Sequence, residues 1–406
     1  MDKNELLIQF ATQIVEVGLA IKENEVLHIN CPVWAYEFGR IVATVAYQKG
    51  AKKVHINYRD DYVNKEFYLH ASMDEIKSIY EYEVMEAKYL VDEKAALLSI
   101  VSPIPKLMEG VDAKKLQERS KASNEKFSFY RQYSMSNKGK WCVVAIPNQT
   151  WADQVFKNKD NSYDLLFDAI MRASRVSSDK FDLLNHMKEL EDHKDLLNNL
   201  NLKSLIFKNN LGTDLKVDLV DDHIWGGGGE YSQSGEYFLP NIPTEEVFTM
   251  PHSHGVNGRV YSTKPLNYQG KIINDFYLDF KDGAVVSYHA KENEDVLKAL
   301  LETDEGSTRL GEVALISYDS PISNMNVLFY NTLFDENASC HLALGNAYTM
   351  NIKNGYEMSL DELKEKGYNS SMIHVDFMFG SKDMNIIGIT KDNKEIKIFK
   401  NGNFVI

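Results

Sequence analysis

Cysteine is scarce in this chain: of 406 residues only Cys31, Cys142 and Cys340 are cysteines, and they lie far apart. Three scattered cysteines exclude a disulfide framework and a cysteine-rich zinc site, and they favour a reducing compartment, so we expect a cytoplasmic protein. The sequence also lacks a run of about eighteen apolar residues, and residues 1–25 lack the pattern of a secretory signal. We therefore expect no transmembrane span and no membrane partner.

Positive charge is also in short supply, since 45 Lys and Arg stand against 59 Asp and Glu, for a net charge of −14. Nucleic acids and anionic membranes bind clustered Lys and Arg, so we expect neither as a partner. No G-x-G-x-x-G or Walker-type loop occurs at the expected strand–helix junctions, so a nucleotide cofactor lacks support. Apolar residues are plentiful at 44%, which is enough for the core of one large or two ordinary domains.

The first half of the chain alternates between helical and strand patterns. Asp2 and Glu5 match a capping box at the start of a helix that we expect to continue to about Lys22. This rhythm is typical of an open α/β sheet covered by helices. On the strongly polar last helix, His186 and His193 are predicted to be solvated. Strands are expected at 25–32, 52–60, 95–103 and 141–147, and further helices at 34–51, 73–90, 112–127, 161–174 and 179–201.

From about Ser204 onward, alternating and apolar runs with short turns predict a strand-rich region. Asp-Gly at 282–283 and Asn-Gly at 401–402 are typical hairpin turns. The fold class we expect is therefore α/β, with an N-terminal open α/β domain (1–190) and a β-rich α+β C-terminal domain that binds metal (191–406).

Residues 225–229, Trp-Gly-Gly-Gly-Gly, are expected to form a flexible loop. Such a loop would be either a linker-like turn or a lid near a site.

A histidine and a carboxylate lie two residues apart in the apolar run Met-Ile-His-Val-Asp-Phe-Met-Phe-Gly, at His374 and Asp376. In a strand, side chains at i and i+2 point to the same face, so imidazole and carboxylate would lie side by side. A buried carboxylate is costly unless it is paired or binds a metal ion. Alone, this pair fits either a hydrogen bond at a sheet edge or a metal site.

Two further segments place carboxylates beside apolar residues. Glu312, in Leu-Gly-Glu-Val-Ala-Leu, would share a strand face with Ala314, where it is either an ion-pair partner or a metal ligand. In Pro-Thr-Glu-Glu-Val, Glu245 and Glu246 are consecutive, so in an extended segment only one of them can face a given cavity. The residues themselves do not decide which one, and the ordinary alternative is a pair on the surface.

His341 and Tyr348 lie seven residues apart in Cys-His-Leu-Ala-Leu-Gly-Asn-Ala-Tyr. We expect a helix here, on which they would share one face at a rise of about 10 Å, too far for both to bind one ion. Gly345 would interrupt that helix, or the two residues would serve different ions. Each could also be an ordinary buried residue. Together, the four segments offer carboxylates, a phenol and two imidazoles, enough for two divalent ions that share a carboxylate.

In this order, the segments Pro-Thr-Glu-Glu-Val-Phe-Thr, Leu-Gly-Glu-Val-Ala-Leu, Phe-Asp-Glu-Asn-Ala-Ser-Cys-His-Leu-Ala-Leu-Gly-Asn-Ala-Tyr and His-Val-Asp-Phe-Met-Phe-Gly-Ser resemble the aminopeptidase T/aminopeptidase S family of metallopeptidases. The similarity runs along the whole chain, and its specificity lies in these segments. The resemblance implies two divalent ions, and the mixed oxygen and nitrogen donors suit zinc, cobalt or manganese. The ligands it implies are Glu246, Glu312, His341, Tyr348, His374 and Asp376.

The expected reaction is removal of the N-terminal residue from short peptides by a hydroxide that bridges the two ions. Glu245 is the candidate base that accepts the water proton. Tyr348 would bind an ion or donate a hydrogen bond to the oxyanion. The resemblance also implies a homodimer.

Two other functions fit the same residues. An amidohydrolase or phosphoesterase could use the same two ions, but a phosphoesterase also needs Arg or Lys to hold phosphate, and Arg259 and Lys264 are the nearby candidates. A non-catalytic protein could instead bind a small ligand in its α/β domain and carry no transition metal. In that protein Glu312, His341 and Asp376 would be structural.

Overall fold

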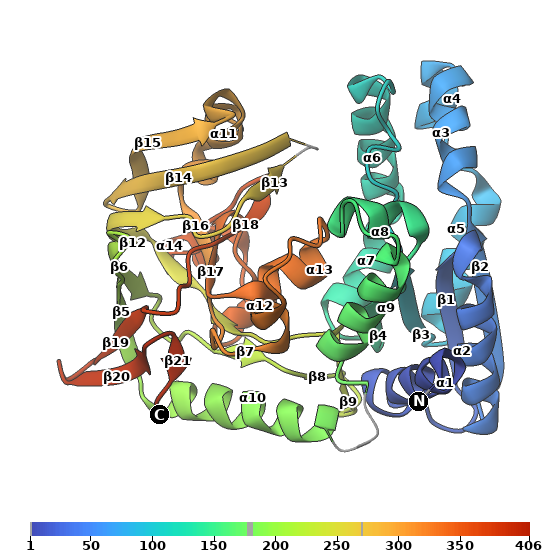
Figure 1. Cartoon of the computed structure of the whole chain (residues 1–406), viewed down its shortest axis with the longest axis horizontal. Coiled ribbons are helices and arrows are strands. Elements are labelled where there is room, and N and C mark those ends of the chain that lie inside the picture. The colour runs from blue at the N-terminus through green and yellow to red at the C-terminus, as the bar shows by residue number, and fades with distance from the viewer. Residues whose placement is uncertain (1, 177–181, 269–270) are drawn as a thin grey trace. The chain divides into compact units, whose positions relative to one another are not determined.

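The structure is a computed structural model of the whole chain and describes residues 2–176, 182–268 and 271–406 (Figure 1). Internal contacts divide the chain into two compact units. The first comprises Met1–Leu184 and Gly229–Pro243, and the second comprises Asn185–Gly228 and Thr244–Ile406. Among the described residues, no helix is both long enough and apolar enough to cross a membrane.

The first unit is built on a parallel sheet of five strands in the order β10-β4-β3-β1-β2. Helices alternate with these strands along the chain, which confirms the predicted open α/β arrangement. The strands are β1 (Val26–Pro32), β2 (Lys53–Arg59), β3 (Ala96–Val101), β4 (Trp141–Ala145) and β10 (Asn241–Ile242). The helices are α1 (Lys3–Gln13), α2 (Tyr36–Gln48), α3 (Asp61–His70), α4 (Met73–Lys77), α5 (Glu81–Asp92), α6 (Ala113–Lys126), α7 (Ser128–Met135), α8 (Gln149–Val155) and α9 (Ser162–Ala173).

Local signals explain where the helices begin and end. The capping box is present, because the Asp2 side chain accepts from the Glu5 N–H and the Glu5 side chain accepts from the Asp2 N–H. The helix ends sooner than predicted, in a π-helical turn at Ile14–Gly18. The single helix predicted at 73–90 is two helices, because the backbone is extended where α4 ends and again at Tyr80 before α5.

The chain returns once to the first unit through residues 229–243. This segment contains the hairpin of β8 (Glu230–Tyr231) and β9 (Tyr237–Phe238), and it supplies β10, which pairs with β4 at the edge of the sheet. The sequence, by contrast, predicts a single boundary near residue 190, because a two-residue strand carries no readable pattern.

The second unit contains two antiparallel sheets. The smaller sheet has the order β18-β17-β16-β11-β7, and the larger one runs β13-β14-β12-β6-β5-β19-β20-β21 with β15 beside β14. The smaller sheet consists of β7 (Gly226–Gly227), β11 (Val247–Thr249), β16 (Leu310–Leu315), β17 (His341–Gly345) and β18 (His374–Met378). The larger sheet consists of β5 (Leu202–Lys208), β6 (Asp214–Leu219), β12 (Pro251–Tyr261), β13 (Leu266–Tyr268), β14 (Lys271–Lys281), β15 (Ala284–Glu292), β19 (Asn385–Thr390), β20 (Glu395–Lys400) and β21 (Asn403–Phe404).

Both predicted hairpins are confirmed. Asp282 and Gly283 join β14 to β15 with φ of +50° and +83°, and Asn401 and Gly402 join β20 to β21 with φ of +51° and +78°. Positive φ at both turn residues is the geometry that matches the twist of paired strands.

Short helices connect the strands of the second unit. The predicted helix 161–174 is α9 of the first unit, whereas the predicted helix 179–201 corresponds to α10, and its residues 179–181 lie outside the described residues. The helices that follow it are short and lie between strands. α10 spans Asp182–Asn199, and the short helices after it are α11 (Glu294–Leu301), α12 (Pro321–Met325), α13 (Thr332–Asp335) and α14 (Leu360–Glu365), with 3-10 turns at Glu305–Thr308, Glu336–Ala338, Thr349–Asn351 and Gly355–Glu357.

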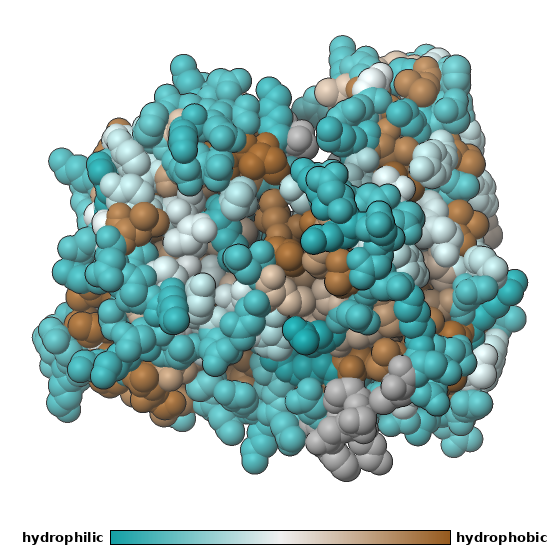
Figure 2. Space-filling model, in the orientation of Figure 1, coloured by the Kyte–Doolittle hydropathy of each residue, from teal (hydrophilic) through white to brown (hydrophobic). Residues whose placement is uncertain are grey.

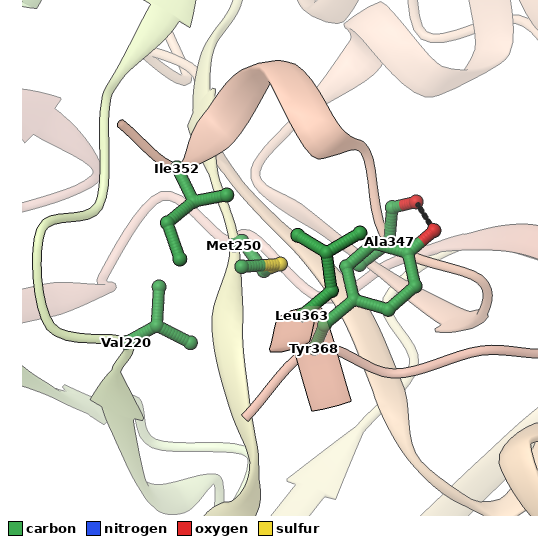
Figure 3. Packing of buried hydrophobic residues seen from close by; sticks show 6 residues of the cluster. All are labelled: Val220, Met250, Ala347, Ile352, Leu363 and Tyr368. Carbon is green, nitrogen blue, oxygen red and sulfur yellow. Dashed lines mark hydrogen bonds between the residues drawn. The ribbon is translucent and has the colours of Figure 1, made fainter. Parts of the chain in front are cut away.

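A hydrophobic cluster in the second unit holds the segment that follows β17 (Figure 3). Ala347 is buried in this cluster, and its carbonyl oxygen accepts a hydrogen bond of 2.7 Å from the Tyr368 hydroxyl. The neighbouring residue Tyr348 is therefore attached to a packed base. The cluster comprises Val220, Met250, Ala347, Ile352, Leu363 and Tyr368.

Hydrophilic residues prevail on the face drawn in Figure 2, and hydrophobic ones lie there in small separate groups. This agrees with the general preference of charged residues for the surface, since they rarely lie fully buried unless they are paired. Buried carboxylates and imidazoles in such a protein call for a physical explanation.

Candidate metal centre

One face of the smaller sheet of the second unit carries the predicted carboxylates and imidazoles. On β17, Ala343 lies opposite Asp376 of β18 on one side and opposite Glu312 of β16 on the other. Directly opposed residues point to the same face, so these two carboxylates share it. His341 and His374 lie two residues away from Ala343 and Asp376, and the period of two in a strand places them on that face as well.

Glu246 reaches the same face from β11. Phe248 of β11 lies opposite Ala314 of β16, and Ala314 lies opposite His341. Glu246, two residues before Phe248, therefore points to the face that carries His341.

The nitrogen and oxygen atoms of these side chains lie close together. His341 Nε2 is 3.3 Å from Glu246 Oε2, 3.3 Å from Glu312 Oε1 and 3.9 Å from Asp376 Oδ1. His374 Nε2 is 3.5 Å from Glu312 Oε2 and 3.4 Å from Asp376 Oδ1. The structure thus brings together five of the six residues predicted as ligands.

Glu312 belongs to two groups of potential ligands at once. Ligand atoms of Glu246, Glu312 and His341 lie within 4.8 Å of one another, and so do those of Glu312, His374 and Asp376. One oxygen of Glu312 faces His341 and the other faces His374. A carboxylate with its two oxygens directed to two donor groups can be shared by a pair of neighbouring divalent ions.

The two imidazoles titrate far from their ordinary range. Burial alone would lower the pKa of His341, but the hydrogen bond to Glu312 and the charges of Glu246 and Asp376 raise it to about 10. Burial would likewise lower the pKa of His374, but the hydrogen bond and charge of Asp376, followed by the charge of Glu312, raise it to about 9. In the metal-free protein, protons on these imidazoles therefore balance part of the negative charge.

Glu336 is a further member of this cluster that the sequence analysis did not identify. Burial and then the charges of Glu246 and Asp376 raise the pKa of Glu336 well above its usual range. Burial also raises the pKa of Glu246 to about 7, against the opposing charge of His341. The sequence offered no signal beyond the position of Glu336 five residues before His341, because the burial of this segment is visible only in the structure.

Buried polar atoms without partners indicate that the cluster fits cations. His341 Nδ1 is buried and has no hydrogen-bond partner among the described residues, and buried Asp376 Oδ1 lies 3.4 Å from His374 Nε2, which is long for a hydrogen bond. Such atoms are rare in folded proteins, and an ion is one explanation for them. His374 Nδ1 lies 2.7 Å from the Asn346 carbonyl oxygen, so it must donate its proton there, and Nε2 is the nitrogen that can bind a metal ion once it has lost its own proton. Carboxylate oxygens and imidazole nitrogens are ligands that suit divalent transition metals.

Tyr348 lies beside His374, but no helix connects it to His341. The centroids of the Tyr348 and His374 rings are 4.7 Å apart, and burial followed by the charges of Glu312 and Asp376 raises the pKa of the Tyr348 hydroxyl. The predicted helix is wrong, because His341 lies on a strand that ends at Gly345, where φ is +106°. The turn after Gly345 brings Tyr348 back to the site.

Glu245 and Glu246 diverge, as an extended segment requires. The carboxylate of Glu245 lies 3.5 Å from His186 Nε2, which is also 2.8 Å from the Thr244 carbonyl oxygen. The side chains of Glu245 and His186 are only 4% and 10% exposed. The prediction that His186 is solvated is therefore wrong, and so is that for His193, whose ring stacks on Phe404 at 4.1 Å.

The glycine stretch predicted as a flexible loop contains a strand that supports the site. Gly226 and Gly227 form β7 and pair with Phe248 and Val247. Gly227 has φ of +142°, and a Cβ added there would lie 2.5 Å from the Glu246 carbonyl oxygen. Only glycine allows this close approach, because its lack of a side chain permits both the conformation and the contact.

A cavity of about 300 Å³ in the second unit adjoins the cluster. Glu336, His374 and Asp376 form one part of its wall, and apolar residues such as Leu266 and Tyr330 form another. A cavity that joins candidate metal ligands to an apolar wall is a suitable place for a substrate.

The surroundings of the two cations considered for phosphate binding do not favour that role. Arg259 holds Asp279 with two hydrogen bonds of 2.6 and 2.7 Å. Lys264 is largely buried, and this burial lowers its pKa despite the charge of Asp335. Neither residue is therefore arranged as an exposed phosphate-binding group.

Comparison with known proteins now decides the family. The model of the family described as thermophilic metalloprotease (M29) matches residues 3–404. The chain belongs to this family. It is thus a metal-dependent peptidase, and the enzyme class predicted from the four segments is confirmed.

Individual relatives cover nearly the whole chain of this M29 metalloprotease. It is 44% identical to "Aminopeptidase AmpS" of Bacillus subtilis over 99% of this chain and 98% of the relative, and 43% identical to "Aminopeptidase 2" of Geobacillus stearothermophilus over 98% and 97%. Among solved structures, AmpT from Thermus thermophilus matches with a TM-score of 0.92 and 31% identity over 100% of both chains. This match confirms the predicted fold class.

Proposed function

We propose that this metalloprotease is an aminopeptidase that removes the N-terminal residue from short peptides with two divalent ions. One observation carries the proposal: Glu312 directs its two oxygens to two separate groups of donors on a single sheet face. A centre with one ion would not need a shared carboxylate. The names of the relatives, all aminopeptidases, support the choice of an exopeptidase.

We assign one ion to Glu246, Glu312 and His341, and the other to Glu312, His374 and Asp376. The distances among these residues support both groups. Zinc, cobalt and manganese suit the mixture of oxygen and nitrogen donors. Once bound, the ions would supply an activated water as nucleophile and would polarise the scissile carbonyl group.

Tyr348 is the sixth residue of the proposed site. Its ring packs against His374, and its pKa is raised by burial, so its hydroxyl keeps its proton at neutral pH. A protonated phenol can donate a hydrogen bond to the oxyanion that forms when a peptide bond is attacked. Its position beside His374 is also compatible with a role as ligand.

Glu336 is the carboxyl group that we assign to proton transfer, and Glu245 is the alternative. Glu336 lines the cavity together with His374 and Asp376, and a carboxylate in that position can take a proton from water and pass it to the leaving amine. Glu245 was the candidate from the sequence, but its carboxylate lies against His186. We propose that Glu245 and His186 fix the segment that carries Glu246.

An assay of metal dependence tests the proposed function. The protein is dialysed against a chelator, reloaded with zinc, cobalt or manganese, and given leucyl-p-nitroanilide, a tripeptide, the same tripeptide with an acetylated N-terminus, and p-nitrophenyl phosphate. We expect metal-dependent cleavage of the first two substrates alone. Cleavage of the phosphoester alone would establish a phosphoesterase, and cleavage of the acetylated peptide at the same rate would exclude an aminopeptidase. A protein without bound transition metal and without activity would fit the non-catalytic alternative.

We also propose that the protein is a cytoplasmic homodimer, as the family resemblance implies. The scarcity of cysteine supports the compartment. Light scattering of the purified protein tests the dimer, and a mass of one chain would exclude it.

A further inference from the structure

Two strand edges line the cavity beside the candidate metal centre. β18 is the last strand of the smaller sheet and β13 is the last strand of the larger one, and the two are in contact. Figure 1 shows β13 beside β18. Consecutive residues of both strands, 266–268 and 374–376, line the cavity. Side chains on one face of a strand would supply only alternate residues, so the cavity runs along the edges of the strands.

The hydrogen bonds of β18 show which of its residues direct their main-chain groups toward β17 and which direct them away from it. In an antiparallel pair, residues alternate between those bonded to the partner strand and those whose N–H and C=O groups point away from it. Ile373 and Phe379 are bonded to the β17 side, because the Ile373 oxygen accepts from the Asn346 N–H at 2.7 Å and the Phe379 N–H donates to the Cys340 oxygen at 3.0 Å. The residues between them with outward main-chain groups are therefore His374, Asp376 and Met378.

Met378 already makes a main-chain hydrogen bond on the side of β18 that faces away from β17. Its carbonyl oxygen accepts a hydrogen bond of 2.9 Å from the Thr263 N–H, which lies outside the smaller sheet. Among the described strands, β18 pairs with β17 alone, so His374 and Asp376 present their main-chain donors and acceptors along the cavity. An edge with such groups is a template for another extended chain.

We propose that a peptide substrate binds along β18 as an added strand, with main-chain hydrogen bonds to His374 and Asp376. This rests on the proposed function and names how that site recognises its substrate. The side chains of the same two residues belong to the candidate metal centre, so the register of the substrate and the position of its scissile bond are fixed by the same residues. The two residues span about 7 Å along the strand, the length of two substrate residues.

The proposal fits the short peptides named as substrates under the proposed function. Main-chain hydrogen bonds do not depend on the substrate side chains, and addition of a strand is a common mode of peptide recognition. The volume of about 300 Å³ lies at the lower end of the range for ligand pockets. The space between the two edges therefore suits a few residues of extended peptide.

Ester replacements in the substrate test this proposal. Three tetrapeptides of one sequence are compared with the metal-loaded enzyme: the parent, a variant whose second amide is an ester, and a variant whose third amide is an ester. Each ester removes a single N–H and leaves the first bond, which is cleaved, unchanged. Since adjacent residues of a strand direct their N–H groups to opposite sides, we expect one ester to lower kcat/KM by about three- to tenfold and the other to change it less than twofold.

Binding provides a second readout that does not depend on turnover. The same series is made with a reduced, non-cleavable first bond, and calorimetry should give the same alternation in Kd. Equal behaviour of both esters, whether both bind like the parent or both lose affinity alike, would overturn the proposal. If the parent peptide is cleaved at its first bond while the esters behave alike, the inference fails and the proposed function survives. If the parent is bound but never cleaved at that bond, the proposed function fails.

Discussion

Replacement of Glu312 by glutamine separates a two-ion centre from a one-ion centre. Its oxygens lie 3.3 Å from His341 Nε2 and 3.5 Å from His374 Nε2, so a single carboxylate serves both donor groups. Glutamine keeps the shape but loses the charge and one acceptor oxygen. Even residues that only hydrogen-bond to metal ligands typically change metal affinity by about 10- to 100-fold when they are mutated. Loss of a shared ligand should therefore lower the binding affinity for both ions by about 100-fold or more.

Glu246→Gln is the matched control, because Glu246 belongs to only one of the two groups. We expect Glu246→Gln to keep one ion per chain and Glu312→Gln to keep none after dialysis. Both changes replace a buried carboxylate by the same amide, so a difference between them reports the sharing of the ligand and not the loss of a charge.

The assay is elemental analysis of each variant after dialysis against metal-free buffer, with thermal unfolding followed by circular dichroism to confirm the fold. Isothermal titration of the metal-free proteins gives the affinity of each ion. The reasoning is refuted if Glu312→Gln retains both ions, or if the two variants lose the same single ion.

Three other predictions follow from the site. Glu336→Gln should lower kcat by about 10²- to 10⁴-fold with its metal content unchanged, whereas Glu245→Gln should lower kcat less. Steady-state kinetics and metal analysis of both variants test this. A larger loss of kcat in Glu245→Gln than in Glu336→Gln would reverse the assignment. Gly227→Ala should destabilise the protein by about 2–4 kcal/mol, because a Cβ there meets the main chain at 2.5 Å and the φ of +142° is strained for alanine; an unfolding midpoint in urea equal to that of the original protein would show that the contact relaxes. His341 and His374 have pKa values of about 10 and about 9 in the metal-free protein, so at pH 7 an entering ion must displace their protons. Metal affinity should therefore fall as pH falls from 9 to 6, by about tenfold per pH unit for each displaced proton. Calorimetry in buffers of different ionisation enthalpy measures the protons released when metal binds. The absence of proton release would contradict the prediction.

Local patterns in the sequence predicted much of the fold. The strands of the first unit were predictable because apolar runs such as Leu97–Ile100 are bounded by turns, and the hairpin turns because Asp-Gly and Asn-Gly favour positive φ at both positions. The small strand β10 could not be predicted, because its place at the edge of the sheet depends on pairing with a segment about a hundred residues away. Pairing between distant segments leaves no local pattern.

The candidate site divides in the same way. The period of two placed His374 and Asp376 on one face without knowledge of the fold, and the structure agrees. For His341 the same rule failed, since β17 is buried on both faces and its apolar run carries neither the strand nor the helix period. That these residues bind metal stays a prediction.

Glu336 shows the limit more sharply. Nothing in Asp335-Glu336 distinguishes a surface pair from a buried one, because the difference lies in what packs against it. Only the fold reveals that Glu336 lies in the field of Glu246 and Asp376.

The second solved structure with this fold shows where the function must lie. It is a 2,5-dihydroxypyridine dioxygenase from Pseudomonas putida, which matches with a TM-score of 0.54 at 10% identity and so shares the fold alone. A fold that also occurs in a protein named as a dioxygenase does not by itself specify a peptidase. The specification must come from side chains on one sheet face, where Glu312 is directed to two donor groups. Glu312, His341 and Asp376 lie on the three adjacent strands β16, β17 and β18, so a register shift of one residue in any one of these strands would turn its candidate ligand to the other face of the sheet.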